Sequence, residues 1–451
     1  MVSVPHTDHR LIELKIQFVN IERGPSYWKF NNQLLRDKGF VDLMNNLIDE
    51  FLSQNTCLCD SLKWELLKIQ MREFCTAYAA GRKRKQNNSQ LSLQKDLDET
   101  DTLLANNTQD LNLLMKREQI KVELEVFSQE EAQSAQVRSR VQFIEEGEKN
   151  TKYFLNLEKS KANMKIMDRL QTEDGRVFNT QKDIMKEQVR FFKDSFEKRS
   201  EFNQMSANEF VQDLNIPILS NDQQGKLDSE ITRKELTIAL KLLNNDSAPG
   251  LDGLTTCFYK VFWLKIRDVV HASFVASFVN GELSTTQNQA VLTLINKGKD
   301  LPRDDLGNWR PISLTNIDYK ILAKCLAMRL STVICDIIHE NQVGFMKGRK
   351  FSTMIRLIGD TIDIMNTLDK PGILLVVDFR RAFDSISKDY ILFAFEKFGF
   401  GDNFKGWASV NMNNSQGCIS YTGWICKHFL WKQVFVKDVH SRQWLLLLPL
   451  K

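Results

Sequence analysis

Hydrophobic and polar positions change their spacing several times along this chain, and each change predicts an element. Residues 10–20 alternate between apolar and polar, as a β-strand does, whereas residues 37–80 carry helical spacing. Gly81 interrupts that helix. After it, residues 86–110 are polar enough for a loop or a loose helix, and residues 111–165 have the pattern of a charged helix.

The second half of the chain has denser apolar segments. A hairpin signal at Asp174-Gly175 and a helix over residues 181–198 come first, and residues 200–228 are polar and irregular, as in a linker. A compact domain is expected from about residue 229. Within it, residues 257–279 form an amphipathic helix that Asn280-Gly281 ends as a C-cap pair. The pattern therefore predicts an α+β fold with a mostly helical N-terminal region.

Composition adds limits rather than identity. The 451 residues, 42% hydrophobic and 26% charged, suit a globular protein of about two to four domains. The net charge is only +4, so we expect binding partners to be selected by local charged patches and not by the overall charge of the protein. The scattered cysteines argue against a zinc site and fit a reducing compartment. With no signal-peptide pattern and no apolar run long enough for a bilayer, we expect an intracellular protein, nuclear or cytoplasmic, without membrane contact.

Candidate chemistry appears at two places in the C-terminal half. A short apolar run over residues 372–377 ends at Asp378, and a carboxylate at the end of a buried strand can hold Mg²⁺. Taken alone, an aspartate in the position of Asp378 is more often a turn or cap residue than a metal ligand. Lys297, Lys299 and Arg310 lie on a predicted hairpin, where they can clamp a triphosphate or form a solvated basic surface.

Four blocks occur in a specific order: APGLDG (248–253), NWRPISL (308–314), NQVGF with GR (341–349) and VVDFRRAFDS (376–385). Together they resemble the reverse transcriptase domain of non-LTR (LINE-type) retrotransposons. The resemblance implies right-hand polymerase fingers from about residue 229 and a palm from about residue 370. It also implies RNA-directed DNA synthesis with an RNA template, a DNA primer, dNTP and Mg²⁺.

The resemblance assigns roles by position. Asp378 resembles the first catalytic metal ligand, and the backbone carbonyl of Phe379 a further metal contact. Phe383 occupies the position that abuts the sugar 2′ carbon and excludes ribonucleotides. Lys297 and Arg310 resemble the contacts to the nucleotide triphosphate.

The resemblance extends toward the N-terminus. Residues 1–22 look like the last strand of an apurinic-type endonuclease, in which Asp8 and His9 match a terminal Asp-His pair. The nuclease's other metal-binding residues are absent, so this remnant is expected to be inert. Residues 138–159 look like a block that grips template RNA, combining charge with a stacking platform, although a solvated amphipathic helix has the same pattern. Its candidate contacts are Lys149, Lys152, Tyr153 and Phe154.

Resemblance stops after Phe429. The family continues with Gly-Val-Arg-Gln-Gly-Cys-Pro-Leu-Ser-Pro and then a Tyr-x-Asp-Asp hairpin, and this sequence shows neither. However, the missing motif can be encoded in another reading frame, in which each codon takes the third base of one printed codon and the first two bases of the next. The codons possible for this sequence then permit the motif in order, from the Gln433/Val434 junction to the Arg442/Gln443 junction. We hypothesise a frameshift near residue 430, caused by a genomic lesion, a misplaced splice junction or a sequencing error.

The expected organisation has four parts: an endonuclease remnant (1–22), a helical linker and template-binding region (23–228), fingers with a partial palm (229–429) and an out-of-frame tail (430–451). Phosphoryl transfer by two metals needs carboxylates on both sides. Only Asp378 is supplied, so we expect a reverse transcriptase truncated at both ends and inactive. The alternative is a non-catalytic RNA-binding remnant or a decayed element product. The basic run at residues 82–85 fits nuclear import or a solvated helix end.

Overall fold

Two compact units make up the computed structural model: Met1–Gly24 with Glu73–Asp168, and Pro25–Arg72 with Arg169–Lys451. These units reflect packing, and the expected domain boundaries at residues 22, 228 and 429 stay predictions. The structure describes residues 2–3, 10–11, 24–106, 109–139, 166–197, 202–298, 301–344, 346, 348–377, 386–413, 416–426 and 429–430.

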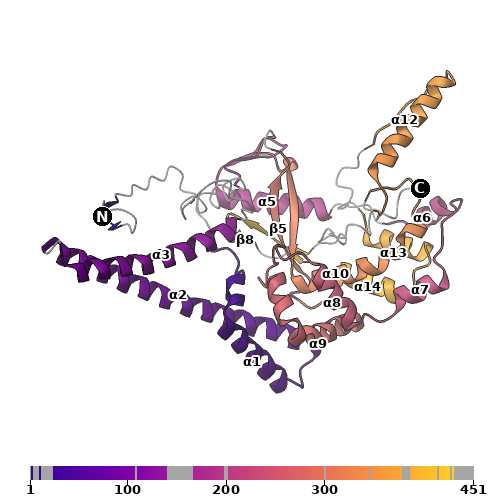
Figure 1. The fold of residues 1–451 in the computed structure, drawn as a ribbon. Helices are drawn as coiled ribbons and strands as arrows, with labels where there is room; N and C mark the ends of the chain where they lie inside the picture. The colour runs from indigo at the N-terminus through magenta and orange to yellow at the C-terminus, as the bar shows by residue number, and fades with distance from the viewer. Residues whose placement is uncertain are drawn as a thin grey trace. The chain divides into compact units, whose positions relative to one another are not determined.

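The first unit contains a helical hairpin (Figure 1). It joins the later part of α2 (Asp60–Asn106) to α3 (Leu111–Ser139), and Leu97 packs between them with Ile120 and Leu124. The prediction that Gly81 interrupts the helix was wrong, since α2 continues through it. A glycine inside a helix costs only about 1 kcal/mol, which the neighbouring helix formers offset. Strands β1 (Val2–Ser3) and β2 (Arg10–Leu11) pair antiparallel.

The second unit is built on a mixed sheet of order β6-β5-β7-β8, with β9 pairing to β7. β5 and β6 form an antiparallel hairpin, whereas β5 and β7 run parallel. A separate small hairpin carries Gly175 at φ +81°, which confirms the expected turn. The strands are β3 (Leu170–Gln171), β4 (Val177–Phe178), β5 (Gln289–Asn296), β6 (Trp309–Thr315), β7 (Gln416–Tyr421), β8 (Trp424–Ile425) and β9 (Phe429–Leu430).

Most of the other described residues of the second unit are helical. The linker expected over residues 200–228 was wrong in part, since α6 and α7 form there, each with a side-chain N-cap. The helix expected over residues 257–279 is confirmed as α9, and Gly281 ends it at φ +73°. The helices are η1 (Asn32–Arg36), α1 (Lys38–Gln54), α5 (Gln181–Glu197), α6 (Gln204–Val211), α7 (Asn221–Asp228), α8 (Arg233–Leu242), α9 (Thr256–Asn280), η2 (Leu306–Asn308), α10 (Ile317–Leu330), α11 (Ile334–Ile337), α12 (Phe351–Thr367), α13 (Lys388–Lys397) and α14 (Asp402–Met412).

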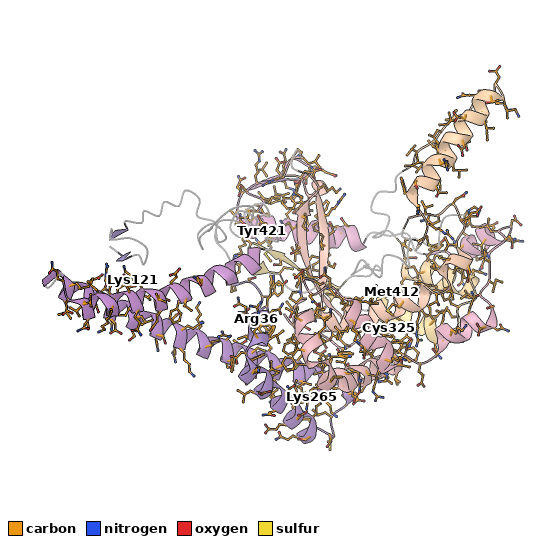
Figure 2. The ribbon with its side chains drawn as sticks, in the orientation of Figure 1. Arg36, Lys121, Lys265, Cys325, Met412 and Tyr421 are labelled. Atoms are coloured by element: carbon orange, nitrogen blue, oxygen red, sulfur yellow. The ribbon has the colours of Figure 1, made fainter. Side chains whose placement is uncertain are left out.

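The core of the second unit takes its aromatic residues from both ends of the sequence. The ring of Phe258 on α9 lies tilted against Phe262 and edge to face against Phe30, at 4.7 and 5.0 Å between ring centroids. Cys325 on α10 is buried in the helical layer, whereas Lys265 on α9 is partly exposed and pairs with Asp49 of α1 (Figure 2). The segment Pro25–Arg72 is therefore part of this core.

The segment after α12 departs from expectation. Residues 372–377 were expected to form a buried strand, yet they carry no strand assignment, and the Ile373 and Val376 side chains are 97% and 85% exposed. An extended apolar segment becomes a strand only when a neighbouring strand takes up its backbone hydrogen bonds. No residue of α12 is buried either.

Among the described helices, none is long and apolar enough to cross a membrane.

Candidate functional site

Two of the predicted site residues lie at the tip of the β5–β6 hairpin. Arg310 pairs directly with Ile295 in the register, and the backbone N–H of Lys297 donates to the carbonyl of Asn308 at 2.8 Å. Lys297 follows Ile295 by two residues, so the alternation of a strand puts it on the same face as Arg310. Both side chains are exposed. The hairpin thus presents two cations on one face.

The connection between these strands is fixed by its own side chains. Trp309 is buried, and its Nε1 donates to the carbonyl of Arg303 at 3.0 Å. Asp305 Oδ1 accepts from the backbone N–H of Gly307 at 2.7 Å, which closes a tight turn. The backbone that carries Lys297 and Arg310 is therefore well braced.

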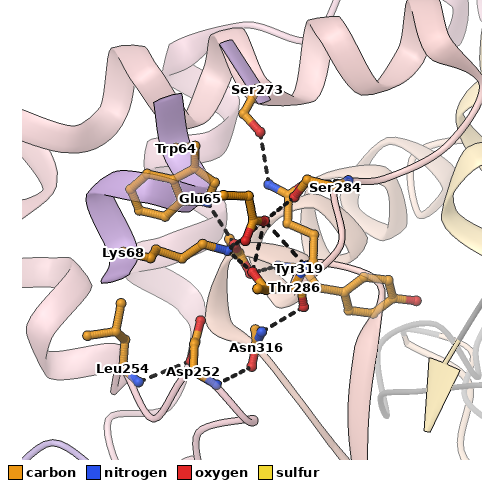
Figure 3. A network of polar contacts seen from close by, with 12 residues as sticks. Trp64, Glu65, Lys68, Asp252, Leu254, Ser273, Ser284, Thr286, Asn316 and Tyr319 are labelled. Carbon is orange, nitrogen blue, oxygen red and sulfur yellow. Dashed lines mark hydrogen bonds and ion pairs between the residues drawn. The ribbon is translucent and has the colours of Figure 1, made fainter. Parts of the chain in front are cut away.

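The base of the hairpin ends in a buried polar network (Figure 3). Asn316, directly after β6, donates from Nδ2 to the carbonyl of Thr286, just before β5, at 2.7 Å. Glu65 of α2 receives the hydroxyl of Ser284 at 2.5 Å and both the N–H and the hydroxyl of Thr286, at 3.3 and 2.9 Å. One carboxylate therefore holds the segment that enters β5.

Lys68, one turn further along α2, is the cation of this network. Its Nζ lies 3.0 Å from Asp318 Oδ2 and also donates to the Thr286 hydroxyl, and the Lys68 and Asp318 side chains are 3% and 0% exposed. Trp64 Nε1 donates to the same Asp318 oxygen at 2.9 Å. Burial lowers the pKa of Lys68, but the charges of Asp318 and Glu65 outweigh it and hold that pKa above its usual value. The ammonium is therefore charged and paired.

The loop with the sequence APGLDG lies against this network. Asn316 Oδ1 accepts from the backbone N–H of Asp252 at 3.2 Å, and a side chain at Gly250 would overlap Asn316. Gly253 adopts φ +75°, and a Cβ there would overlap Trp28. Both glycines of this block are therefore required by packing and backbone conformation.

The Asp252 carboxylate accepts fewer hydrogen bonds than the Glu65 and Asp318 carboxylates of this network. Its Oδ1 accepts from the backbone N–H of Leu254 at 3.1 Å, while Oδ2 has no hydrogen-bond partner among the described residues. Burial, and next the charge of Asp318, raise the pKa of Asp252 to about 7. The nearby Tyr259 hydroxyl, also buried, likewise lacks a partner within the described part of the chain.

The GR block has a structural role that sequence reasoning did not identify. The guanidinium of Arg349 donates to the carbonyls of Ile338, His339 and Gln342 at 3.0, 2.6 and 2.8 Å. Gly348 before it takes φ +84°. This arginine therefore holds its own loop closed after α11.

Sequence reasoning also missed Glu65, Lys68 and Asp318. A signal was present, because Lys68 lies on the apolar stripe of α2 between the buried Trp64 and Met71. A charge on such a stripe needs a buried partner.

The remaining predicted site residues lie outside the described residues, and their roles stay predictions. In the described part of the chain, no group of three or more His, Cys, Asp or Glu side chains could hold a metal ion. The residues concerned are Asp8, His9, Lys149, Lys152, Tyr153, Phe154, Lys299, Asp378, Phe379 and Phe383.

Comparison with known proteins identifies the domain. Residues 295–426 match the family described as reverse transcriptase (RNA-dependent DNA polymerase). The transposon TX1 uncharacterized 149 kDa protein of Xenopus laevis is 29% identical over 93% of this chain and 32% of its own length. The retrovirus-related Pol polyprotein from type-1 retrotransposable element R2 of Popillia japonica is 28% identical over 41% of this chain and 25% of its own. The chain thus spans about a third or less of these relatives, and over residues 295–426 it resembles the reverse transcriptases of non-LTR retrotransposons.

Proposed function

We propose that this chain carries the fingers, from about residue 229, and part of the palm, from about residue 370, of an RNA-directed DNA polymerase. The observation that supports the proposal is the pair of exposed cations, Lys297 and Arg310, on one face of the β5–β6 hairpin. The arginine side chain offers a bidentate fork to phosphate oxygens and the lysine a point charge. This face would hold the triphosphate of an incoming dNTP.

Other roles in this proposal follow the family. Asp378 and the Phe379 carbonyl would hold Mg²⁺, which stabilises the attacking and leaving oxygens of the transferred phosphoryl group. Phe383 would select the deoxyribose, and an RNA template with a DNA primer would occupy the cleft of the hand. Template contacts would come from Lys149, Lys152, Tyr153 and Phe154.

Nucleotide binding tests the proposal directly. Titration with a fluorescent dNTP and Mg²⁺ should show binding, and Arg310→Gln should weaken it by about tenfold, which is the effect of one charged hydrogen-bond pair. Arg356→Gln is the matched control, because Arg356 is an exposed arginine on α12 and not on the hairpin. Binding that is equal in all three proteins, or absent from the unsubstituted chain, contradicts the proposal.

Catalysis by this particular polypeptide is a separate question. Its sequence has no Tyr-x-Asp-Asp after Asp378, so we propose that the 451-residue polypeptide does not extend a primer. Mg²⁺ gives up its waters reluctantly and would bind weakly to one carboxylate. Primer extension on an RNA template measures this, and Mg²⁺-dependent incorporation that Asp378→Asn abolishes would refute it.

The frameshift hypothesis has its own test. The DNA and the transcript can be resequenced across codons 425–451 and beyond. An alternative frame that opens into a Tyr-x-Asp-Asp hairpin supports the hypothesis, whereas bases that confirm the printed frame remove it.

RNA binding without synthesis is the second candidate function. It is favoured by the basic turn of residues 82–85, whose four side chains are all exposed in the interior of α2. The sequence alone had also fitted a solvated helix end at residues 82–85. No Asp or Glu occurs between Glu73 and Asp96, so the charged residues in this stretch of the sequence are all basic. Primer extension separates the two functions.

A further inference from the structure

Both ends of the β5–β6 hairpin meet in the buried network of Figure 3. β5 begins at Gln289, shortly after Thr286, and β6 ends at Thr315, directly before Asn316. The hydrogen bond from Asn316 to the Thr286 carbonyl joins the two ends. The base of the hairpin is therefore a closed structure.

The groups that hold this base come from a distant part of the sequence. Glu65 holds the entry to β5 through Ser284 and Thr286, and Lys68 spans from Thr286 to Asp318 behind the exit from β6. The two side chains lie one helical turn apart on α2 and contact each other at 3.3 Å. Both precede the residues that match the reverse transcriptase family, 295–426.

We infer that Glu65 and Lys68 are positioning residues that set the direction of the β5–β6 hairpin and, with it, the place of Lys297 and Arg310. The eight residues of β5 span about 26 Å at roughly 3.3 Å per residue. A tilt of about 10° at the base would then move the tip by about 4 to 5 Å, whereas bound groups must be placed to about 1 Å. A firm base is therefore needed for a specific contact at the tip.

The first measurement is hydrogen exchange of backbone amides in the whole chain. Thr286→Val removes the hydroxyl that Glu65 and Lys68 share and keeps the Lys68–Asp318 pair. We expect amide exchange in β5 and β6 to rise by about tenfold, with no change in α13 and α14. Thr286→Ser, which keeps the hydroxyl, should restore the slow exchange, and Lys63→Met is the control on the same helix.

Lys68→Met is the stronger variant, and it should raise exchange in the hairpin further if the protein folds. If Lys68→Met does not fold, hydrogen exchange in Thr286→Val still tests the inference. Exchange that stays unchanged in the hairpin of Thr286→Val overturns the inference. A rise of equal size in α13 and α14 does so too, because the network would then support the core as a whole.

The second measurement is the affinity for a fluorescent dNTP with Mg²⁺, and this readout rests on the proposed function. Thr286→Val should bind the nucleotide at least fivefold more weakly, and Thr286→Ser normally. If the unsubstituted chain binds no nucleotide, the proposed function fails while the exchange result still stands. If that chain binds and Thr286→Val binds equally well, the positioning role fails.

Discussion

Asp228, the last residue of α7, caps a helix to which it does not belong. Its Oδ1 accepts a hydrogen bond of 2.8 Å from the backbone N–H of Phe404, 176 residues further along the chain. The N-cap residue of that helix, α14, is Gly401, which has no side chain to do this. A Cβ at Gly401 would overlap the Asp228 carboxylate. The glycine and the aspartate therefore work as one capping unit between two helices.

Loss of this cap should lower stability. Asp228→Ala removes the acceptor, and we expect the free energy of unfolding to fall by about 1 kcal/mol, as for other N-caps. Asp228→Asn keeps an acceptor oxygen and should retain most of the stability. Thermal unfolding of the three proteins measures this, and equal losses in both variants would show that the acceptor is not the cause.

Arg329 of α10 should contribute more. Its guanidinium donates to the Glu235 carboxylate at 2.7 and 2.9 Å and to the carbonyls of Leu227 and Glu230 at 2.9 and 2.7 Å. Arg329→Met leaves these acceptors without the donor, and we expect a loss of about 3 to 5 kcal/mol in urea unfolding. Arg329→Lys keeps the positive charge but loses the forked guanidinium, so its stability should lie between that of the original chain and that of Arg329→Met. A loss below about 1 kcal/mol for Arg329→Met would contradict this assignment.

Stability should depend on pH through Asp252. Its pKa is about 7 in the folded protein and 3.8 for the unperturbed side chain. Below about pH 4 both states hold the proton, but between pH 4 and pH 7 the unfolded state releases it first. The contribution of Asp252 to stability is therefore lost as pH rises through this window, and it is level above it.

Asp252→Asn removes that dependence. Asparagine keeps the acceptor for the backbone N–H of Leu254 and carries no charge, so the variant should gain stability relative to the original chain as pH rises from 5 to 8. Chemical denaturation at several pH values measures the difference. A difference that stays constant over this range would show that Asp252 does not titrate there.

RNA binding should depend on the basic turn of α2. The triple substitution Lys83→Gln, Arg84→Gln and Lys85→Gln should weaken binding to single-stranded RNA and reduce the slope of log K against log salt by about 2, at 0.7 per phosphate contact. Fluorescence anisotropy at several salt concentrations measures both. The control removes three exposed lysines elsewhere, Lys38, Lys234 and Lys241. Equal slopes in the two triple variants would leave the turn as a solvated surface.

Sequence pattern predicted the elements whose signals are local. The α9 helix and its cap, the small hairpin at Gly175 and helix α5 were found where spacing and turn residues indicated them. The continuation of α2 through Gly81 was missed, because one unfavourable residue was weighed without the helix on both sides. The linker over residues 200–228 was a similar error, since polar residues there include the caps that start α6 and α7.

The side chains that hold the base of the β5–β6 hairpin could not be predicted from local sequence patterns. Lys68 and Asp318 are 250 residues apart, and no local rule predicts which buried acid a buried lysine meets. Gly250 and Gly253 were recognised as part of a motif block, but their need for close approach depends on Asn316 and Trp28. Roles that depend on long-range packing need the structure, whereas motif order sufficed for the family.

The N-terminal segment of the second unit has a consequence for the order of events during synthesis. Ser26 donates its backbone N–H to the carbonyl of Gly423 at 2.8 Å, so these two positions can join only after residue 423 has been made. At about 5 to 20 residues per second, the ribosome needs roughly 20 to 80 seconds to make the intervening chain. Until residues 258–262 have been made, Phe30 and Phe40 lack the rings of Phe258 and Phe262 against which they pack. The newly made N-terminal segment therefore carries aromatic side chains whose partners are still missing, and exposed apolar surface of this kind makes a chain prone to aggregate.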